Sequence, residues 1–421
     1  MFFIEDDGLF WIELWRAYVV SDMIAPYFNL KRKPMSEMKF EITENHLNTG
    51  LRGFPVGTVR TSRVDPQSGV SYVGRPIAEL AEKDPEEIVF LMFNKRLPNQ
   101  EELSAFKTDL ASRAVVDERV FTLLKQLPKD GHPMEWFING LNLLGMVGKS
   151  GDYYEDALNA VARIPAVVAA IFRIRSGWGD PIASKPELGL IENFVHMLGV
   201  PGGDTAALTA LLRTFYVLHM DHGGGNLSTF SGKAVASGLA DLYASLGAAM
   251  AGLYGPLHGR ANQDCLNFVR SVGTSDPEEL DAKLTEVLRG GGKVYGFGHA
   301  VLRVEDPRAT VQYALGDKIC PDDPLFKTAK AMRTIAVDVI RRELPKVSSP
   351  YPNVDAVSGT LLNASGLTDS DYYTVLFGLS RCSGIAAQIV DERTATLWNA
   401  KKGRPTPVAI YRCKYIFDKV D

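Results

Sequence analysis

The chain of 421 residues contains few cysteines and lacks the short motifs of common metal and nucleotide sites. Its four cysteines stand far apart and form no CxxC pair, which argues against a zinc knuckle and against a dense disulfide framework. No HExxH is present, and a phosphate loop at Lys149 fails because GxxxxGK[ST] would need a glycine where Leu143 stands. We therefore expect reduced thiols and no bound metal ion.

The sequence also lacks a long basic run. Lysine and arginine number 46 against 50 acidic residues, which gives a formal net charge of -4. A protein that follows a phosphate backbone usually carries a basic patch or stripe. This balance argues against nucleic acid as a partner.

An uncharged stretch of membrane-spanning length is missing from the apolar first thirty residues. The charges that interrupt it are Glu5, Asp6, Asp7, Glu13, Arg16 and Asp22. We expect no membrane segment here, but an amphipathic arm that packs on the body or on a partner subunit. Alternatively, this is upstream sequence before a later start at Met23 or Met35. Without a clear targeting peptide the expected location is the cytoplasm, with the mitochondrial matrix left open.

The sequence has ample material for a buried core, with 46% hydrophobic residues and a length typical of two or three domains. Strand-like alternation is confined to residues 56–64 and 69–74, around the turn sequence DPQSG. Helical spacing of apolar residues follows in segments 104–114, 134–144, 153–174, 205–218, 232–254, 277–288, 307–314, 324–344 and 370–393. The predicted fold class is all-α with minor β near the N-terminus.

The stretch 231–255 is unusual because its apolar positions are mostly Ala, Gly and Leu. Small residues let neighbouring backbones approach closely, so this helix is expected to be buried. Two interpretations stay open, a plain core helix and the central packing element of a subunit interface.

The seven histidines divide into two groups by their neighbours. A lone histidine on an apolar face is usually a satisfied core residue, which is the better interpretation of His46, His132 and His196. The remaining four lie in the glycine-rich sequences HMDHGGGNLSTF (219–230), GPLHGRAN (255–262) and VYGFGHAVLRVEDPRA (294–309). Glycine neighbours leave a side chain uncovered and let a ligand approach the backbone. These three sequences, with YPNVDAVSG (351–359), are the candidate site.

His258 has a predicted electrical environment of its own. The sequence GPLHG is expected to open the helix that runs through Cys265 and Phe268. The positive end of a helix disfavours an imidazolium ion, so His258 is expected to stay neutral and to donate to an oxygen that gains negative charge.

The sequences DHGGGNLSTF, GPLHGRAN, GFGHAVLRVEDPRA, YPNVDAVSG, GLSRCSG and GRPTP, in this order, resemble the citrate synthase family. The resemblance extends from about Leu51 to Arg412. It implies a multi-helical fold with an N-terminal arm (1–50), a large domain (51–255), a small domain (256–366) that closes over the substrates, and a return to the large domain with a C-terminal arm (367–421).

The resemblance implies a Claisen condensation of acetyl-CoA with oxaloacetate, followed by hydrolysis of citryl-CoA. Removal of a proton from the thioester methyl group needs a base and stabilisation of the enolate oxygen. Asp355 matches the base and His258 the neutral donor to the enolate. His299 matches the residue that polarises the oxaloacetate carbonyl and later assists hydrolysis.

The resemblance also implies the binding residues. Planar guanidinium groups suit the carboxylates of oxaloacetate. The residues matching oxaloacetate contacts are His222, Asn226, Arg308, Arg381 and Arg404, the last donated across a dimer interface. The residues matching those that bind the coenzyme are Val294, Gly296, Gly298 and Asn353. Acetyl-CoA would be a co-substrate with no permanently bound cofactor, and the assembly a homodimer or a higher oligomer of dimers.

Three alternatives remain at this stage. A 2-methylcitrate synthase that uses propionyl-CoA would need room for one more CH₂, a difference of about 1–3 kcal/mol. A metal-dependent hydrolase could use His219, Asp221, His222 and Asp355, although the arginines would then repel the cation or be idle. The third alternative is an inactive helical scaffold.

Overall fold

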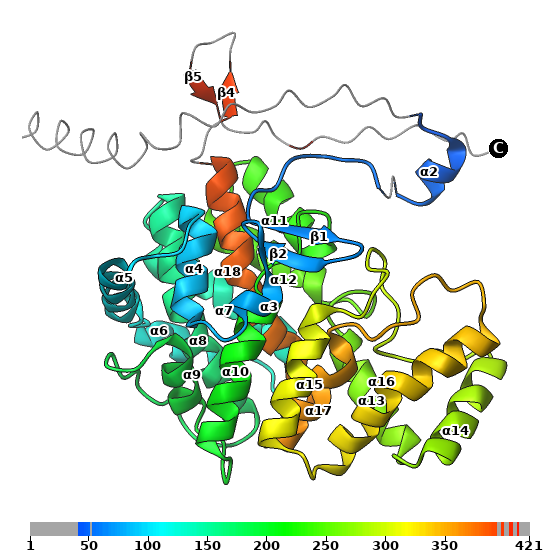
Figure 1. Cartoon of the computed structure of the whole chain (residues 1–421). Helices are drawn as coiled ribbons and strands as arrows, with labels where there is room; N and C mark the ends of the chain where they lie inside the picture. Colours follow the sequence, from blue (N-terminus) through cyan, green and yellow to red (C-terminus); the bar gives the residue numbers. More distant parts are fainter. Residues whose placement is uncertain (1–40, 51–52, 394–396, 400–403, 407–410, 412–421) are drawn as a thin grey trace, which may run out of the picture. The chain divides into compact units, whose positions relative to one another are not determined.

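The computed structural model describes residues 41–50, 53–393, 397–399, 404–406 and 411. It contains two compact units that divide between Val56 and Gly57. The described part of the first unit has one short helix, α2 (Glu44–Asn48). The second unit carries the remaining helices and strands (Figure 1).

The second unit is predominantly helical, which confirms the predicted fold class. Its helices are α3 (Ile77–Leu80), α4 (Pro85–Asn94), α5 (Gln100–Arg113), α6 (Glu118–Leu124), α7 (Pro133–Gly148), α8 (Tyr153–Arg175), α9 (Leu190–Leu198), α10 (Thr205–His219), α11 (Leu227–Ser237), α12 (Leu242–Tyr254), α13 (Ala261–Val272), α14 (Pro277–Arg289), α15 (Pro307–Ile319), α16 (Pro324–Glu343), α17 (Asp355–Ala364) and α18 (Tyr373–Arg393), with the 3-10 turn η2 (Ser370–Tyr372).

The strands are short. Antiparallel β1 (Ser62–Asp65), β2 (Gly69–Tyr72) and β3 (Arg75–Pro76) form the predicted minor β structure, with Ser62 opposite Tyr72. A second antiparallel pair, β4 (Leu397–Asn399) and β5 (Arg404–Thr406), follows α18 in the chain.

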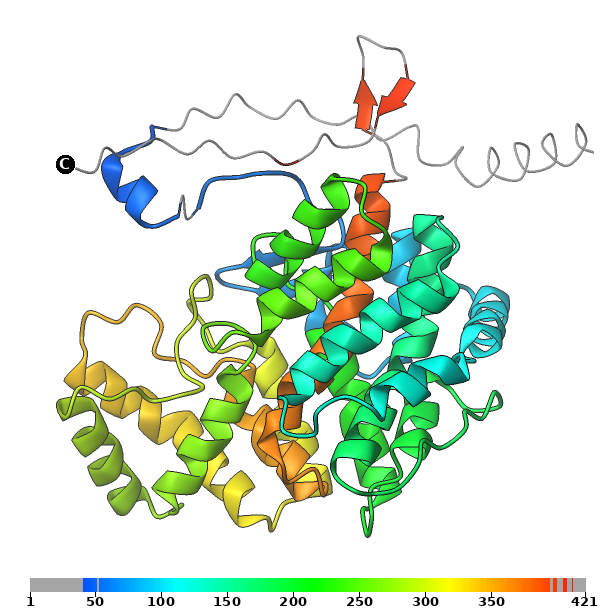
Figure 2. The same ribbon diagram turned by 180° about the vertical axis from the view of Figure 1, so that it is seen from behind.

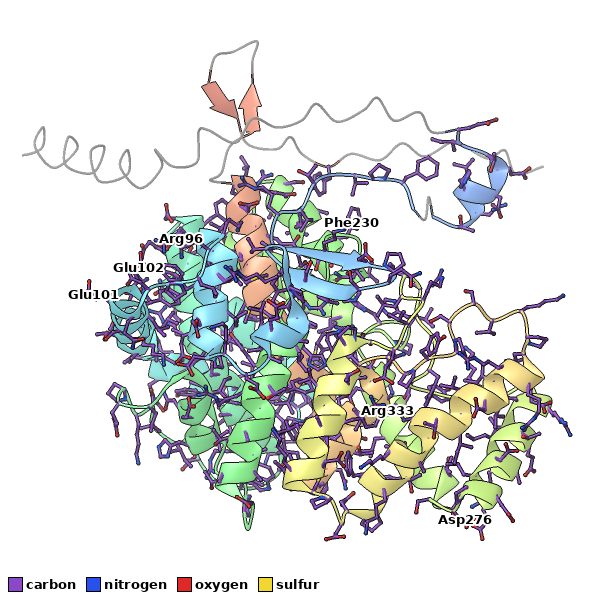
Figure 3. The ribbon with its side chains drawn as sticks, in the orientation of Figure 1. Arg96, Glu101, Glu102, Phe230, Asp276 and Arg333 are labelled. Atoms are coloured by element: carbon purple, nitrogen blue, oxygen red, sulfur yellow. The ribbon has the colours of Figure 1, made fainter. Side chains whose placement is uncertain are left out.

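Aspartate residues fix many of the helix starts. An aspartate at the N-cap accepts a backbone N–H that has no partner within the helix. Asp276 does so at the start of α14, where its carboxylate accepts the N–H groups of Glu278 and Glu279 (Figure 3). Asp306 and Asp323 cap α15 and α16 in the same way. These caps explain why the predicted helices beginning at Pro277, Pro307 and Pro324 start where expected.

The predicted helix 232–254 is wrong as a single element. It is two helices, because the chain turns at Leu239, whose φ is 66°, and Asp241 then caps α12 through the N–H of Ala244. Helix α11 also starts earlier than predicted, at Leu227, where the Asn226 side chain caps it by accepting the Thr229 N–H. Two shorter helices that pack extensively on each other replace the continuous rod.

The main core is built around α8 and α18. Within the described residues, α8 is the one helix that is long and apolar enough to cross a membrane, but 78% of its apolar window is buried among neighbouring helices. Its principal neighbours are α18, α9, α5 and α7. We therefore interpret α8 as a core helix.

A second, smaller hydrophobic cluster joins α13, α14 and α16. Val269, Leu280, Leu284 and Val339 are fully buried in it. Figures 1 and 2 show these three helices side by side at one end of the second unit. All of them belong to the part of the chain between α12 and α18.

Helix α18 approaches the end of α10 with no space between the backbones. A Cβ built on Gly384 would lie 2.1 Å from the carbonyl oxygen of Met220 and 3.0 Å from the Cβ of Asp221. Only a residue without a side chain fits this contact, which places α18 directly beneath the Asp221–His222 turn.

We expect Gly384→Ala to lower the free energy of unfolding by about 1–3 kcal/mol, because the new methyl group must displace backbone. Urea unfolding at fixed protein concentration measures this. Gly255→Ala is the control, since a Cβ there meets nothing within 4 Å, and we expect a change under about 0.5 kcal/mol. Equal unfolding free energies for the two variants would contradict the packing argument.

Candidate active site

The predicted site residues lie on loops that the helices bring together. His222 and Asn226 follow α10, His258 lies between α12 and α13, and His299 lies between α14 and α15. The loop before α17 joins the loop of His299 through two backbone hydrogen bonds, from the Asn353 N–H to the Gly296 carbonyl oxygen at 2.9 Å and from the Gly298 N–H to the Tyr351 carbonyl oxygen at 2.9 Å. Segments far apart in sequence therefore share one region.

His222 and His299 face each other, with ring centroids 5.4 Å apart. Burial, with Arg308 and Arg381 nearby, lowers the pKa of His222 well below its usual value. Its Nε2 is buried and has no hydrogen-bond partner among the described residues. A buried polar atom without a partner is costly, so Nε2 is available to a ligand.

His299 is held in one tautomer by its own loop. The backbone N–H groups of Val301 and Leu302 donate to Nδ1 at 3.0 and 2.9 Å. An N–H group can only donate, so Nδ1 accepts and the hydrogen of the neutral ring is on Nε2. Burial and the positive charge of Arg308 lower the pKa of this histidine. His299 therefore offers an N–H donor from an uncharged ring.

His258 is also neutral, with the opposite tautomer. The Ser228 N–H donates to Nε2 at 3.3 Å, and the Ser228 hydroxyl lies 2.9 Å from the same atom. Since Nε2 accepts the amide hydrogen, Nδ1 carries the ring hydrogen. Burial and Arg381 lower the pKa of His258 to about 4. The expected helix start at GPLHG is wrong, because α13 begins at Ala261; burial, rather than the helix end, is the main reason that the ring is uncharged.

Arg308 is buried against one carboxylate. Its Nε and Nη2 donate to Asp306 at 3.0 and 2.6 Å, and the side chains are 3% and 0% exposed. Burial alone would lower the pKa of Arg308, but Asp306 more than offsets this and raises it. Asp306 also caps α15, so the cap and the guanidinium orient each other.

Arg381 is buried and has no hydrogen-bonded carboxylate among the residues that the structure describes. Its Nε donates to the His219 carbonyl oxygen at 3.0 Å, its Nη1 donates to Asn226 Oδ1 at 3.4 Å, and its guanidinium lies 4.6 Å from the centre of the Phe377 ring. Burial lowers the pKa of Arg381 to about 10. A buried cation that lacks an adjacent carboxylate is well suited to bind an anionic ligand.

Asp355 is the first residue of α17, and its backbone N–H donates to Asn353 Oδ1 at 2.9 Å. Burial raises the pKa of its carboxyl to about 6, while Arg308 and Arg381 oppose the shift. The carboxyl is thus mostly ionised at pH 7 yet is a stronger base than an exposed aspartate.

The four residues expected along the coenzyme lie in the joined loops. Gly296 and Gly298 have φ of 81° and 89°, and a Cβ on Gly296 would lie 2.7 Å from Ala356 Cα and from Cys265 Sγ. Asn353 also donates to the Gly298 carbonyl oxygen at 3.0 Å. Val294 is buried in the second hydrophobic cluster.

Arg404 lies in β5, where the backbone alone is described, so its predicted substrate contact lies outside the described side chains. Two residues of the site were not predicted from the sequence. The Asp306 carboxylate holds Arg308, and the Gln388 amide binds Asp221 beside His222. The run EDPRA did carry a signal for Asp306, because Asp followed by Pro is typical of a helix start. Gln388 lies in a plain helical run with no such signal.

The metal-site alternative does not fit the donor atoms. Asp221 already accepts hydrogen bonds from Thr61, Gln388 and the His222 N–H, and His219 Nδ1 lies 2.8 Å from the Phe215 carbonyl oxygen. Across the described part of the chain, no group of three or more His, Cys, Asp or Glu residues is arranged to hold a metal ion.

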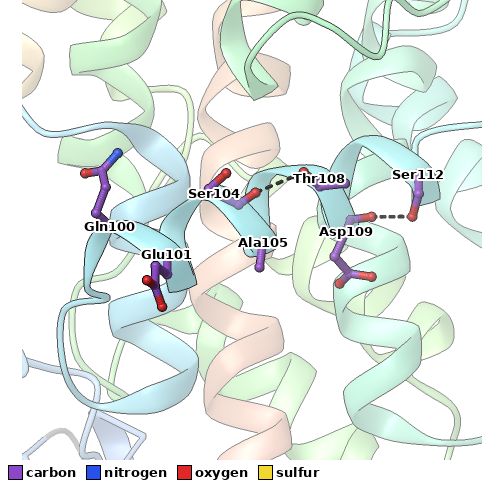
Figure 4. A pocket seen from close by; sticks show the side chains of 7 residues that line it. All are labelled: Gln100, Glu101, Ser104, Ala105, Thr108, Asp109 and Ser112. Carbon is purple, nitrogen blue, oxygen red and sulfur yellow. Dashed lines mark hydrogen bonds between the residues drawn. The ribbon is translucent and has the colours of Figure 1, made fainter.

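A hollow over α5 is unrelated to this region (Figure 4). Its Thr108 and Ser112 hydroxyls donate to the helix carbonyls of Ser104 and Asp109 at 3.0 and 2.7 Å. These side chains are therefore already satisfied within α5.

Comparisons with known proteins identify the family of this chain. A family model described as citrate synthase, C-terminal domain, matches residues 50–406. Citrate synthase 4, mitochondrial, of Arabidopsis thaliana is 38% identical over 385 residues, covering 85% of this chain and 80% of that protein. Citrate synthase, mitochondrial, of Daucus carota is 37% identical, with coverages of 85% and 81%.

Solved structures share the fold. Citrate synthase from Pyrobaculum aerophilum is 25% identical, with a TM-score of 0.75, and the match covers 93% of this chain and 99% of that one. A 22% identical structure (TM-score 0.73, coverages of 89% and 98%) is a ternary complex of carboxymethyl coenzyme A and oxaloacetate with citrate synthase from Thermoplasma acidophilum.

The chain belongs to the citrate synthase family. It is an enzyme, a transferase with citrate synthase function, and the 2-methylcitrate, hydrolase and scaffold alternatives are not favoured. The expected cytoplasmic location is contradicted, since the Arabidopsis and Daucus relatives are both named mitochondrial.

We expect Asp306→Ala to lower the free energy of unfolding by about 3–5 kcal/mol, because it leaves the Arg308 charge buried and unpaired. Asp317→Ala on the same helix is the control: Asp317 pairs with Lys330 at the surface, and we expect a loss under about 1 kcal/mol. Urea unfolding of both variants checks this. Similar losses would show that the Asp306 pair does not stabilise the site.

Proposed function

We propose that Asp355, His258 and His299 carry out the condensation of acetyl-CoA with oxaloacetate. The observation that supports this most directly is the combination of two uncharged imidazoles, each with one ring nitrogen accepting backbone N–H groups, and a carboxyl of raised pKa. This combination provides a base and two neutral N–H donors, the groups that enolate formation and carbonyl attack require.

In the proposed reaction Asp355 takes a proton from the thioester methyl group. The enolate oxygen receives a hydrogen bond from Nδ1 of His258, and the methylene carbon attacks the ketone carbon of oxaloacetate. Nε2 of His299 donates its hydrogen to the ketone oxygen, which becomes the hydroxyl of citryl-CoA. Nε2 of His299, which has given up its hydrogen, then takes a proton from water as the water oxygen attacks the thioester carbon. Asp355 returns its proton to the departing sulfur, which gives citrate and free CoA.

Oxaloacetate is a dianion, and we propose that Arg308 and Arg381 bind its carboxylates with help from His222, Asn226 and Arg404. The cation of Arg381 with no adjacent carboxylate and the open Nε2 of His222 support this assignment. The loops of Gly296, Gly298 and Asn353, with the backbone of Val294, would take the coenzyme. Acetyl-CoA would be the co-substrate, with no permanently bound cofactor. The ligands named for the Thermoplasma structure are oxaloacetate and a derivative of coenzyme A, which supports this substrate pair.

The domain division proposed is an N-terminal arm (1–50), a large domain (51–255), a small domain (256–366) and a C-terminal return (367–421). The separate hydrophobic cluster of α13, α14 and α16 supports a small domain that moves as one body. Closure of that domain would exclude water while the enolate forms.

We further propose a homodimer located in mitochondria. Helix α11 and the turn after it expose Leu227, Val235 and Leu239, the last 72% exposed, an apolar face suited to a second copy. Arg404 would then act across the interface. The names of the mitochondrial relatives support the location.

The pKa of Asp355 predicts the acid limb of the reaction. The base acts when ionised, so kcat/KM for acetyl-CoA should fall about tenfold per pH unit as pH drops below about 6. Asp355→Ala should lose turnover by about 10²–10⁴-fold yet retain oxaloacetate binding. Initial rates between pH 5 and 8 and calorimetric titration with oxaloacetate measure both. A flat profile down to pH 5, or full turnover in the variant, would contradict the assignment.

We expect acetyl-CoA to be preferred over propionyl-CoA by about 10–200-fold in kcat/KM, because a site shaped for a methyl group discriminates one CH₂ by about 1–3 kcal/mol. Free CoA release with oxaloacetate present measures this, and the same assay without oxaloacetate corrects for plain thioester hydrolysis. A higher kcat/KM for propionyl-CoA would reverse the substrate assignment.

A further inference from the structure

A buried polar network adjoins the turn of Asp221, His222 and Gly223. It joins Lys233 of α11 with Gln388 and Glu392, which are one turn apart on α18. The three residues are 4%, 2% and 8% exposed. Lysine and glutamate are rarely buried unless paired, so this network needs a reason.

The hydrogen bonds of Gln388 leave its amide one orientation. Its Oε1 accepts from Lys233 Nζ at 3.2 Å, and its Nε2 donates to Asp221 Oδ1 at 2.8 Å and to the Gly223 carbonyl oxygen at 3.1 Å. An ammonium group can only donate, and a carboxylate or carbonyl oxygen can only accept. Gln388 therefore bridges a cation to two acceptors, which neither a carboxylate nor an apolar side chain can do.

Both acceptors flank His222 in the sequence. Asp221 Oδ1 also accepts the His222 backbone N–H at 2.8 Å, and Asp221 Oδ2 accepts from Thr61 at 2.5 Å. Gln388 thus donates hydrogen bonds to the residues on either side of His222.

The far end of the network is anchored by an ion pair and a tyrosine. Lys233 Nζ lies 2.9 Å from Glu392 Oε1, and the Tyr411 hydroxyl donates to the same oxygen at 2.6 Å. The Tyr411 N–H donates to Ser237 at 3.0 Å, and its ring stacks on Phe230, labelled on α11 in Figure 3. Lys233 therefore interacts with both Gln388 and Glu392, and Tyr411 in turn holds the Glu392 carboxylate.

We propose that Gln388 is a positioning residue for oxaloacetate binding, which Lys233 and Glu392 hold in place and which orients His222 through Asp221 and Gly223. The inference rests on the proposed role of His222 as a substrate ligand. Through His222 the Gln388 amide affects the binding of oxaloacetate, and it has no part in coenzyme binding.

The test is steady-state kinetics of the full-length enzyme. Gln388→Met keeps the volume and removes the three hydrogen bonds. We expect the KM for oxaloacetate to rise about tenfold or more, the equivalent of one to two lost hydrogen bonds, and the KM for acetyl-CoA to change less than about twofold.

Asn193→Leu is the matched control. Asn193 is a buried amide on α9 that is hydrogen-bonded to Ser184 and Lys185 in the loop before that helix. This substitution should reduce stability with both KM values unchanged. An oxaloacetate KM within twofold of the parent in Gln388→Met would overturn the inference.

Gln388→Glu supplies a second readout that a purely structural role would not move. When ionised, the introduced carboxyl cannot donate to Asp221, whereas its protonated form can. The ratio of the variant's oxaloacetate KM to that of the parent should therefore exceed one at pH 8 and fall as pH is lowered to 6. The charged or titratable groups in the network around position 388 are Asp221, Lys233, Glu392 and Tyr411. Two further cations, Lys95 and Arg381, are near enough to Asp221 for its charge to raise their pKa values. A ratio of one throughout would overturn the inference even if Gln388→Met failed to fold.

His222→Ala separates this inference from the proposed function. If it raises the oxaloacetate KM and Gln388→Met does not, the positioning role alone fails. If His222→Ala leaves that KM unchanged, the substrate assignment of His222 fails first. In the double variant, Gln388→Met should add less than twofold to the effect of His222→Ala, because the residue it orients is gone.

Discussion

The site depends on two buried guanidinium groups, of which, among the described residues, only Arg308 is hydrogen-bonded to a carboxylate. Arg308 has Asp306 beside it, whereas Arg381 has carbonyl, amide and aromatic neighbours. Their positive charge adds to burial and keeps His222, His258 and His299 uncharged. It also restrains the upward shift of Asp355, so that this carboxyl stays largely ionised at neutral pH. The two arginines proposed to bind oxaloacetate thus also favour the neutral imidazoles and the ionised Asp355 that the proposed reaction needs.

The helical fold and the location of the site could be predicted from sequence because each has a local signal. Aspartate and proline start helices, and glycine exposes His258 and His299. The break at Leu239 was missed because Ala, Gly and Leu on both sides preserve helical spacing, while the turn depends on Asp241 capping the next helix. Gln388 was missed because its role appears only when α18 passes under the Asp221–His222 turn. Tertiary contact, not propensity, defines it.

Neutrality of His258 was predicted for a reason that the structure replaces. The argument from the helix terminus needs the imidazole in the first turn, but α13 starts three residues later. The Ser228 N–H instead selects the tautomer, and burial selects the charge state. A correct chemical state can thus follow from sequence by a route that the folded chain does not use.

The order of the helices along the chain affects how the protein is made. Helix α8 is apolar enough to resemble a membrane span, and α18, a main partner that covers it, ends at Arg393. The residues of the second cluster are translated between the two. Helices α5, α7 and α9 can pack on α8 early in translation, but the face of α8 that α18 covers stays without this partner until residue 393 has been made. An apolar helix face exposed for that long is prone to aggregation, so we expect chaperone binding to this face during synthesis.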